Sequence, residues 1–376
     1  MSTLADLLKA EGACLWVDRG EDAFEIANRL VRERGWGDGL PVVPPTKERV
    51  EAMLAYCDRP WNEPVGRMAP RYGEATPLRL AANAVMAGCE PQYFPLLLLA
   101  VEAVCQTPFN LYAVQATTHP CCPLLIFNGP IAREVGINAG HNIFGPGAQA
   151  NATIGRALRL AMLNIGGARP GSGDMATQGS PAKYSYCIAE NEAASPWEPL
   201  HVERGFDRDT TTVTVVGGEG PHNINDHESI SAEGILATVA GTMASTGGND
   251  VHYRTQQPVL VLGPEHAATI AEGGFSKAQV KRWLQEHAWL PLSRFSRENI
   301  ERRLKVNFPE RYKDAGPEAK VYEFHNADDL IVIVAGGAGK HSAWIPTFGQ
   351  DTKSVTLALK LVDGRLASRV EDFRQG

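Results

Sequence analysis

Two kinds of apolar segment occur twice in this chain, in the same order, and this repetition limits the folds that the chain can adopt. Segments 123–130 (PLLIFNGP) and 258–264 (PVLVLGP) each end in Gly-Pro, and segments 213–222 and 331–341 each end in Gly-Gly-x-Gly-x-His. A helical pattern lies between the two kinds of segment in both copies. Short apolar runs without alternation are typical of strands buried on both faces. The order predicts an α/β protein with two diverged copies of a strand–helix–strand unit, related by a pseudo-two-fold axis.

The rest of the chain fits around these two copies. The alternative interpretation is that any α/β protein repeats strand, glycine turn and helix without duplication. A long irregular segment, 166–211, interrupts the first copy, and such segments are usually functional loops or lids. In chain order we expect an N-terminal arm and wrapping loop (1–75), the first copy (76–228), the second copy (229–350) and a C-terminal strand and tail (351–376). Helices are expected at 21–34, 46–57, 78–87, 93–105, 151–164, 231–245 and 276–287.

The charge and the cysteines argue against several classes of function. The net charge is −7, and no basic stripe is available for nucleic acid. The longest apolar run, 93–101, is much shorter than the roughly 20 residues of a membrane span, and the first residues lack the regions of a signal peptide. The seven cysteines form no Cys-x-x-Cys, so reduced thiols are expected. We therefore expect a cytoplasmic homo-oligomer with a small-molecule substrate, no nucleic acid and no membrane.

The two Gly-Gly-x-Gly-x-His turns form the first candidate site. Ligands of open α/β sheets bind beyond the carboxyl ends of strands, where glycines allow positive φ and free amides can hold an anion. His222 and His341 would face one cleft if a two-fold axis relates the copies. The alternative is that each is a strand-end residue bonded to a nearby carbonyl. The accompanying substrate-binding candidates are Gly218, Gly220, Asn223, Gly337, Gly339 and Lys340.

A second candidate is segment 117–123, which carries two adjacent cysteines and is expected to connect two strands. His119 is close in sequence to Cys121 and Cys122. A cysteine paired with a histidine can act as a thiolate nucleophile. A free cysteine is more often a small buried hydrophobic residue. Both interpretations stay open.

Two further segments could bind an anion or transfer protons. Segment 145–156 is a glycine loop that runs into a helix, with Asn151 as the expected N-cap and Arg156 placed to hold a carboxylate or phosphate. A plain helix start explains that segment equally well. The long irregular segment contains Lys183 and Glu190, which are acid–base candidates. Its alternative is a solvated loop followed by a strand.

Side chains near the first glycine turn could also bind a metal ion. His222, Asp226, His227 and His252 have donor atoms that suit zinc or iron. Their spacing matches no strong metal motif such as H-E-x-x-H. We predict no cofactor and keep a metal ion as an alternative.

Several motifs resemble a large bacterial family. They are 38–46 (DGLPVVPPT), 84–89 (AVMAGC), 128–130 (NGP), 151–160 (NATIGRALRL) and 336–342 (GGAGKHS). In these segments the chain is similar to the family associated with the UGSC (seleno)proteins, named for a selenocysteine-or-cysteine, Gly, Ser, Cys motif. The chain contains no Cys-Gly-Ser-Cys, so the resemblance implies a larger companion part with a UGSC-type protein as its partner. The resemblance implies no settled reaction and only a leaning toward thiol chemistry.

Three functional hypotheses follow from these features. The first is an enzyme that cleaves a bond in a small carboxylate-bearing molecule at the interface of the two copies, by hydrolysis or elimination. One of the adjacent cysteines would be its nucleophile and one of the candidate histidines its base, while Lys340, Arg156 and the glycine turns would hold the anion. The second is a metal-dependent hydrolase or lyase that uses His222, Asp226 and His227. The third is a non-catalytic companion subunit of a UGSC-type redox protein.

Overall fold

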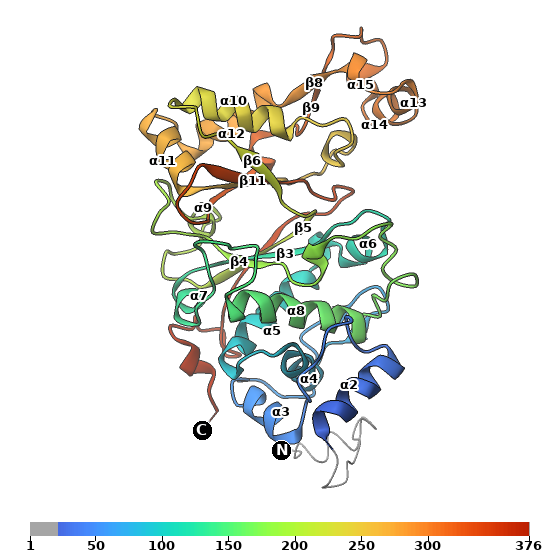
Figure 1. The fold of residues 1–376 in the computed structure, drawn as a ribbon, viewed down its shortest axis with the longest axis vertical. Helices are drawn as coiled ribbons and strands as arrows, with labels where there is room; N and C mark the ends of the chain where they lie inside the picture. The colour runs from blue at the N-terminus through green and yellow to red at the C-terminus, as the bar shows by residue number, and fades with distance from the viewer. Residues whose placement is uncertain (1–21, 376) are drawn as a thin grey trace.

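The computed structural model describes residues 22–375, so the start of the expected N-terminal arm lies outside the described part. The chain is a mixed α/β fold whose helices and sheets are stacked along its long axis (Figure 1). The expected helices are present, and their ends lie within a few residues of the predicted ones. The helices of the first half are α2 (Ala23–Arg34), α3 (Lys47–Leu54), α4 (Pro77–Ala87), α5 (Phe94–Val104), α6 (Leu111–Ala116), α7 (Pro130–Glu134), α8 (Gln149–Asn164) and α9 (Leu200–Glu203). Those of the second half are α10 (Ala232–Met243), α11 (Pro264–Glu272), α12 (Lys277–His287), α13 (Arg297–Asn299), α14 (Lys305–Asn307) and α15 (Pro309–Tyr312).

Two four-stranded sheets form the centre of the molecule. The first has the order β12 (Val355–Ala358), β5 (Thr212–Gly218), β3 (Cys122–Asn128) and β4 (Cys187–Ala189). The second has the order β10 (Ile331–Val334), β7 (Val259–Leu262), β11 (His341–Ile345) and β6 (His222–Asn225). In each sheet one pair is parallel, β3 with β4 and β7 with β10, and the other pairs are antiparallel. Two small ribbons complete the strands: β1 (Arg67–Met68) with β2 (Gly73–Glu74), and β8 (Trp289–Pro291) with β9 (Lys320–Tyr322).

Three apolar cores separate four layers, in the order helices, sheet, sheet, helices (Figure 1). One face of the first sheet packs through Leu125 and Val215 on α5 and α8, and α4 and α3 extend the same core away from the sheet. Its other face meets the second sheet, where Ile126 and Val261 share a core. The far face of the second sheet packs on α10, α11 and α12. Because successive side chains point to opposite faces, strands between two cores are apolar throughout, as the sequence predicted.

Several helix ends are fixed by residues that could be recognised in the sequence. Thr46 accepts a hydrogen bond from the first turn of α3, and Ser276 begins α12 with a capping box. Gly35 ends α2 in the left-handed conformation. The prediction that Asn151 caps α8 is wrong, because α8 begins at Gln149 and Asn151 lies within its first turn.

Each four-stranded sheet contains one strand from the other half of the chain. β6 follows β5 directly in sequence but lies in the second sheet, and β12 follows β11 but lies in the first. The two crossing segments run side by side: Glu219 N donates to Pro346 O (2.9 Å) and Phe348 N donates to Gly217 O (3.0 Å). The boundary expected at residue 228 therefore separates β6 from the other strands of the second sheet. The boundary expected at residue 350 separates β12 from the other strands of the first sheet.

The strand pairing differs from the expected equivalence of the two glycine turns. β3 and β5 are antiparallel, whereas β7 and β10, which match them in sequence, are parallel. Gly217 and Gly218 belong to the extended strand β5, while Gly336 has a φ of 111°. The two glycine turns, which the repeated sequence pattern predicted to be equivalent, therefore differ in backbone conformation and in the pairing of the strands before them. A Gly-Gly sequence fixes neither the direction of strand pairing nor the sign of φ.

One connection differs from expectation, and a second agrees with the alternative given for it. Segment 117–123 joins helix α6 to β3 and does not connect two strands. The irregular segment 166–211 contributes β4, which pairs in parallel with β3, in agreement with the alternative of a loop followed by a strand.

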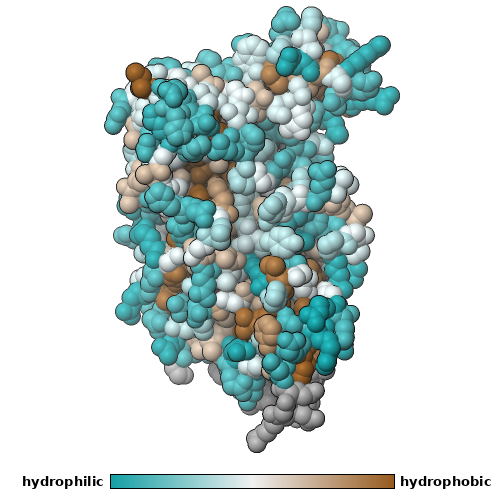
Figure 2. All heavy atoms as spheres, viewed as in Figure 1, coloured by the Kyte–Doolittle hydropathy of each residue, from teal (hydrophilic) through white to brown (hydrophobic). Residues whose placement is uncertain are grey.

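The face shown in Figure 2 is mainly hydrophilic, with apolar residues in small separate groups. Within residues 22–375, no single helix combines the length and the apolarity that crossing a membrane requires. The segments Pro91–Val104 and Thr107–Ala116 meet that requirement only as a pair, with a bend of 70° between them. The residues of α5, in the first segment, pack in the core between the helices and the first sheet.

Candidate functional site

A histidine–carboxylate pair lies where the two crossing segments meet. His119 Nε2 and Glu219 Oε1 are 2.6 Å apart. Glu219 stands in the crossing from β5 to β6, and His119 lies just before β3. The His119 ring stacks on Phe348 in the other crossing segment, with ring centroids 5.7 Å apart. Both crossings therefore contribute to the surroundings of this pair.

Hydrogen bonds fix both partners of the pair. The Glu219 backbone carbonyl accepts a bond from the Tyr186 hydroxyl (2.8 Å), and His119 N–H donates to Thr117 Oγ1 (3.0 Å). An ionised carboxylate only accepts, so His119 Nε2 carries the proton and Nδ1 has the lone pair. Nδ1 is buried without a hydrogen-bond partner in the protein. A neutral imidazole in this state can take a proton from a bound molecule.

Three charged side chains lie near the start of β3. Asp174 accepts bonds from Lys183 Nζ (2.7 and 2.9 Å) and from Arg159 Nη2 (2.8 Å). Burial alone would raise the pKa of Asp174, but the bonds and charges of Lys183 and Arg159 outweigh burial, and the pKa is lowered. Two cations share one carboxylate, so this cluster has an excess positive charge when all three groups are ionised. Such an excess favours an anionic ligand.

The irregular segment brings this charge cluster to the loop that holds His119. Thr177 N donates to Thr118 O (2.9 Å). Ser180 lies against Gly220, which follows Glu219 in the crossing from β5 to β6. A Cβ added to Gly220 would be 3.9 Å from Ser180 Oγ. Ser180 Oγ is buried without a partner and is a second polar atom that a ligand could satisfy.

Cys121 and Cys122 lie close to both groups, but their thiols are not activated. Both side chains are buried, and the Cys121 thiol donates to Val114 O (3.7 Å). Burial raises the pKa of both thiols, that of Cys122 to about 12, and the Lys183 charge offsets this only in part. The thiolate is therefore the disfavoured form. The geometry fits the interpretation of these cysteines as small buried hydrophobic residues and argues against a nucleophile.

Glu190 lies at the other end of β3 and β4, away from His119. Its carboxylate accepts bonds from Asn128 Nδ2 (2.7 Å) and Leu200 N (2.8 Å). Burial raises the pKa of Glu190, and the charge of Lys277 and these bonds only partly oppose the rise. Glu190 thus joins β4 to β3 and to the start of α9, and the structure does not bring it to the other acid–base candidates.

Arg156 and Asn151 are engaged inside the protein. Arg156 forms a two-bond ion pair with Asp38 (2.7 and 3.0 Å) and donates to Pro41 O (2.9 Å), which ties the N-terminal arm to α8. Asn151 binds the backbone of Asn138 through both amide atoms (2.7 and 3.1 Å). The expectation that these two side chains hold an anionic ligand is not supported, because their polar atoms already have internal partners.

The two histidines of the glycine turns lie on neighbouring strands but on opposite faces. In the β11–β6 ladder His341 is opposite Asn225, and His222 is opposite Trp344. Directly paired residues share a face, and successive residues alternate. His341 and Trp344 are three positions apart, so His222 and His341 point to opposite sides of the sheet. The prediction that they face one cleft is wrong.

His341 instead contacts His227. Their Nε2 atoms are 3.2 Å apart, and His341 Nδ1 is 2.9 Å from Asn223 Oδ1. Lys340 Nζ donates to the His227 carbonyl (2.8 Å). The sequence-predicted residues Lys340, Asn223, His227 and His341 therefore form a second polar group, at the edge of the second sheet.

The expected metal set is not assembled as predicted. Asp226 accepts bonds from Thr238 Oγ1 (2.6 Å) and Ser229 N (2.9 Å), which uses both of its oxygens. The His252 ring packs against the Phe295 ring, with centroids 6.4 Å apart. Within residues 22–375, no group of three or more His, Cys, Asp and Glu side chains is arranged to hold a metal ion.

The glycines of the two turns mainly allow close packing. An added Cβ at Gly337 would overlap the His141 ring, and one at Gly218 would lie 2.9 Å from Ile345 Cγ2. Gly339 has a φ of 130°, and its N–H donates to Glu265 Oε1 (2.7 Å). The Gly339 amide is therefore used by a side chain, so an anion-binding role for this turn is not supported.

A buried acidic pair beyond the crossing segments could not be recognised in the sequence. Asp250 accepts bonds from Thr347 N (2.9 Å) and Thr347 Oγ1 (2.8 Å), and burial raises its pKa to about 8. Burial and the Asp250 charge raise the pKa of Glu323 well above its usual range. The charge of Glu219 adds to both shifts, which places the acidic pair near the His119 site.

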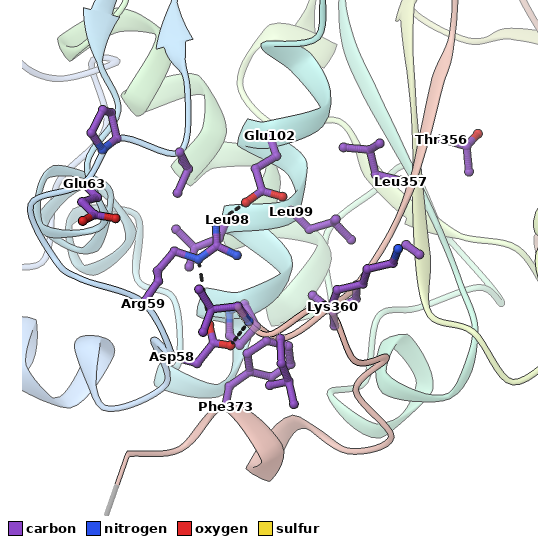
Figure 3. Close-up of a pocket in the computed structure, with 18 of the residues that line it drawn as sticks. Asp58, Arg59, Glu63, Leu98, Leu99, Glu102, Thr356, Leu357, Lys360 and Phe373 are labelled. Atoms are coloured by element: carbon purple, nitrogen blue, oxygen red, sulfur yellow. Dashed lines mark hydrogen bonds and ion pairs between the residues drawn. The ribbon is translucent and has the colours of Figure 1, made fainter.

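A cavity of about 520 Å³ lies between α5, β12 and the loop after α3 (Figure 3). Arg59 reaches from that loop toward Glu102 of α5, and Asp58 lies beside it. Leucines of α5 and of the β12 segment form much of the wall. None of the sequence-predicted site residues lines this cavity, and it holds no histidine or cysteine, so we do not assign the chemistry to it.

No family model, curated protein or solved structure matches the chain. The assignment of the site therefore depends on its geometry. The resemblance to the UGSC-associated family stays a prediction.

Proposed function

We propose that the protein is an enzyme that cleaves a bond in a small carboxylate-bearing molecule, by hydrolysis or elimination, with His119 as its general base. The His119–Glu219 pair carries this proposal, because it combines a carboxylate-bonded Nε2 with a buried, unpartnered Nδ1. Glu219 selects the tautomer and would stabilise the imidazolium that forms when Nδ1 takes a proton. The side chains of His119 and Glu219 keep 13% and 27% exposure, so the pair lies at the border of the solvent-accessible surface with Nδ1 on its buried side.

The charge cluster supports a carboxylate as the recognised group. Lys183 and Arg159 share the single carboxylate of Asp174, which leaves one positive charge for a ligand. Both cations are held by bonds to Asp174, so little side-chain freedom is lost when a ligand arrives. Ser180 Oγ would add a hydrogen-bond donor beside them.

The proposed chemistry needs no thiolate. In an elimination, His119 Nδ1 removes a proton next to the carboxylate and the leaving group departs from the adjacent carbon. In a hydrolysis, the same nitrogen takes a proton from a water whose oxygen bonds to the electrophilic atom of the substrate, and it returns that proton to the leaving group as its bond breaks. Cys121 and Cys122 stay protonated in both cases, consistent with their burial.

The experiment is a turnover screen of small hydroxy-, amino- and thio-substituted carboxylic acids, followed by proton NMR, with the matching amides as negative controls. We expect His119→Asn to lower kcat by about 10²–10⁴-fold and Lys183→Met to raise KM more than it lowers kcat. His287→Asn, at the exposed end of α12, is the matched control and should keep full activity. The double variant Cys121→Ser/Cys122→Ser should keep most of its turnover.

Full turnover by His119→Asn would contradict the proposal. Loss of all turnover in a correctly folded double cysteine variant, with His119→Asn still active, would return the nucleophile role to the thiols.

We also infer that the chain contains two diverged copies, in which the equivalent strands differ from those that the sequence pattern indicated. Both sheets share the pattern parallel, antiparallel, antiparallel, in the orders β4–β3–β5–β12 and β10–β7–β11–β6. Gly129 after β3 lies against the Thr210 carbonyl just before β5, and Gly263 after β7 lies against the His341 carbonyl at the start of β11. These observations support β3 with β7, β5 with β11 and β6 with β12 as equivalents. Each copy would then donate its last strand to the other sheet, and the site would lie at their interface.

A further inference from the structure

We propose that His227 and His341 form a binding site for one divalent transition-metal ion, separate from the His119 site. The Nε2 atoms of the two rings face each other at 3.2 Å, and the ring centroids are 5.0 Å apart. Two nitrogen ligands of a tetrahedral ion, with bonds of roughly 2.0–2.1 Å, lie about 3.3 Å apart. An ion bound by both rings would therefore hold the two Nε2 atoms at nearly the separation that the N–H···N hydrogen bond between the rings gives them.

The partner of His341 directs the lone pair of this ring toward the proposed site. His341 Nδ1 is 2.9 Å from Asn223 Oδ1, and because an amide oxygen only accepts, Nδ1 carries the proton. The neutral His341 ring then presents the Nε2 lone pair to His227. Oxygen acceptors on the second ring nitrogen orient metal-bound imidazoles in the same way.

The backbone around His227 is held before any ligand arrives. Asp226 accepts a bond from Thr238 Oγ1 (2.6 Å), and its carbonyl lies 3.0 Å from His266 Nε2, so the turn after β6 is fixed on both sides. Lys340 Nζ donates to the His227 carbonyl (2.8 Å), which directs the ammonium to an oxygen rather than to the ring nitrogens. A fixed pair of ligands lowers the entropy lost on binding.

The donor set indicates the class of ion. Within the described part of the chain no third His, Cys, Asp or Glu side chain completes a group with these two rings. Both histidines are exposed, so water or an anion can take the other coordination positions. Imidazole nitrogens suit Zn²⁺, Ni²⁺ and Cu²⁺, whereas Mg²⁺ and Ca²⁺ prefer oxygen ligands. The expected ion is therefore one of the first group.

The test is calorimetric titration of the full chain with zinc chloride, repeated with nickel chloride. We expect one ion per chain, weakened at least tenfold by His227→Ala and by His341→Ala, and by about tenfold in Asn223→Ala. His222→Ala is the matched control, because His222 is exposed and lies on β6, next to the strand of His341, but outside the pair, and it should bind like the wild type. Circular dichroism checks that each variant is folded.

Electron paramagnetic resonance with one equivalent of Cu²⁺ gives a second readout. The wild type should show coupling to two imidazole nitrogens, and each single histidine variant should lose one of them. Binding weaker than millimolar in the wild type, or unchanged binding in both histidine variants, overturns the proposal. Loss of turnover at the His119 site would leave this metal-binding result unaffected.

Discussion

Asp250 couples the stability of this fold to pH. Burial raises its pKa from the ordinary value of 3.8 to about 8, so the folded state favours the neutral acid. The stability that this group contributes is complete at low pH and is lost as the pH rises from about 4 to about 8. We expect Asp250→Asn, which stays neutral, to raise Tm by several degrees at pH 8 and to change it little at pH 4.5. Calorimetric melts of both proteins at a series of pH values measure the difference, and a constant difference across that range would contradict the assignment.

Some residues of the proposed site could be predicted from the sequence. His119 and Lys183 were selected by their neighbours in the chain, and the structure brings them to one region. Glu219 was noted in the sequence only as the variable residue of a Gly-Gly-x-Gly turn. No local sequence pattern marked Asp174 or Arg159 as site residues. A carboxylate becomes a partner through closeness in space, and the separation of 100 positions in sequence between His119 and Glu219 hides that closeness.

At the scale of single elements, the Gly-Pro pairs after β3 and β7 require a residue without a Cβ at Gly129 and Gly263. An added Cβ at Gly129 or Gly263 would overlap a backbone carbonyl, at Thr210 and His341, and a backbone atom cannot rotate away. We expect Gly129→Ala and Gly263→Ala each to reduce the free energy of unfolding by about 1–3 kcal/mol. Gly241→Ala in α10 is the control, because nothing lies within 4 Å of its added Cβ and alanine favours helix. Urea denaturation measures all three, and a neutral Gly263→Ala would contradict the predicted overlap.

The elements themselves were largely predictable, and their pairing was not. Helix caps such as Thr46 and apolar strands such as Val259–Leu262 follow from local chemistry. The direction in which β5 pairs with β3 depends on the path of the chain through 166–211, and the transfer of β6 to the second sheet depends on the crossing segments. These are long-range properties, which local propensity does not encode.

At the scale of the whole molecule, the exchanged strands should join the two halves into one folding unit. β12, which follows the second half in sequence, pairs with β5 of the first, and β6 of the first half pairs with β11 of the second. The core between the sheets, with Ile126 and Val261, adds contact between them. We expect hydrogen exchange in increasing denaturant to give the same opening free energy for β3 and β7. Exchange of β7 at a clearly lower free energy than β3 would show that the halves unfold separately.

The proposed reaction requires that Glu219 holds His119 with its proton on Nε2 and a free lone pair on Nδ1. Nitrogen-15 NMR of the histidine side chains measures this directly, with the His119 signals assigned from their absence in His119→Asn. We expect a protonated Nε2 and an unprotonated Nδ1 in the neutral ring, and a mixture of tautomers in Glu219→Gln, because an amide can donate as well as accept. A neutral His119 with its proton on Nδ1, or one that Glu219→Gln leaves unchanged, would contradict it.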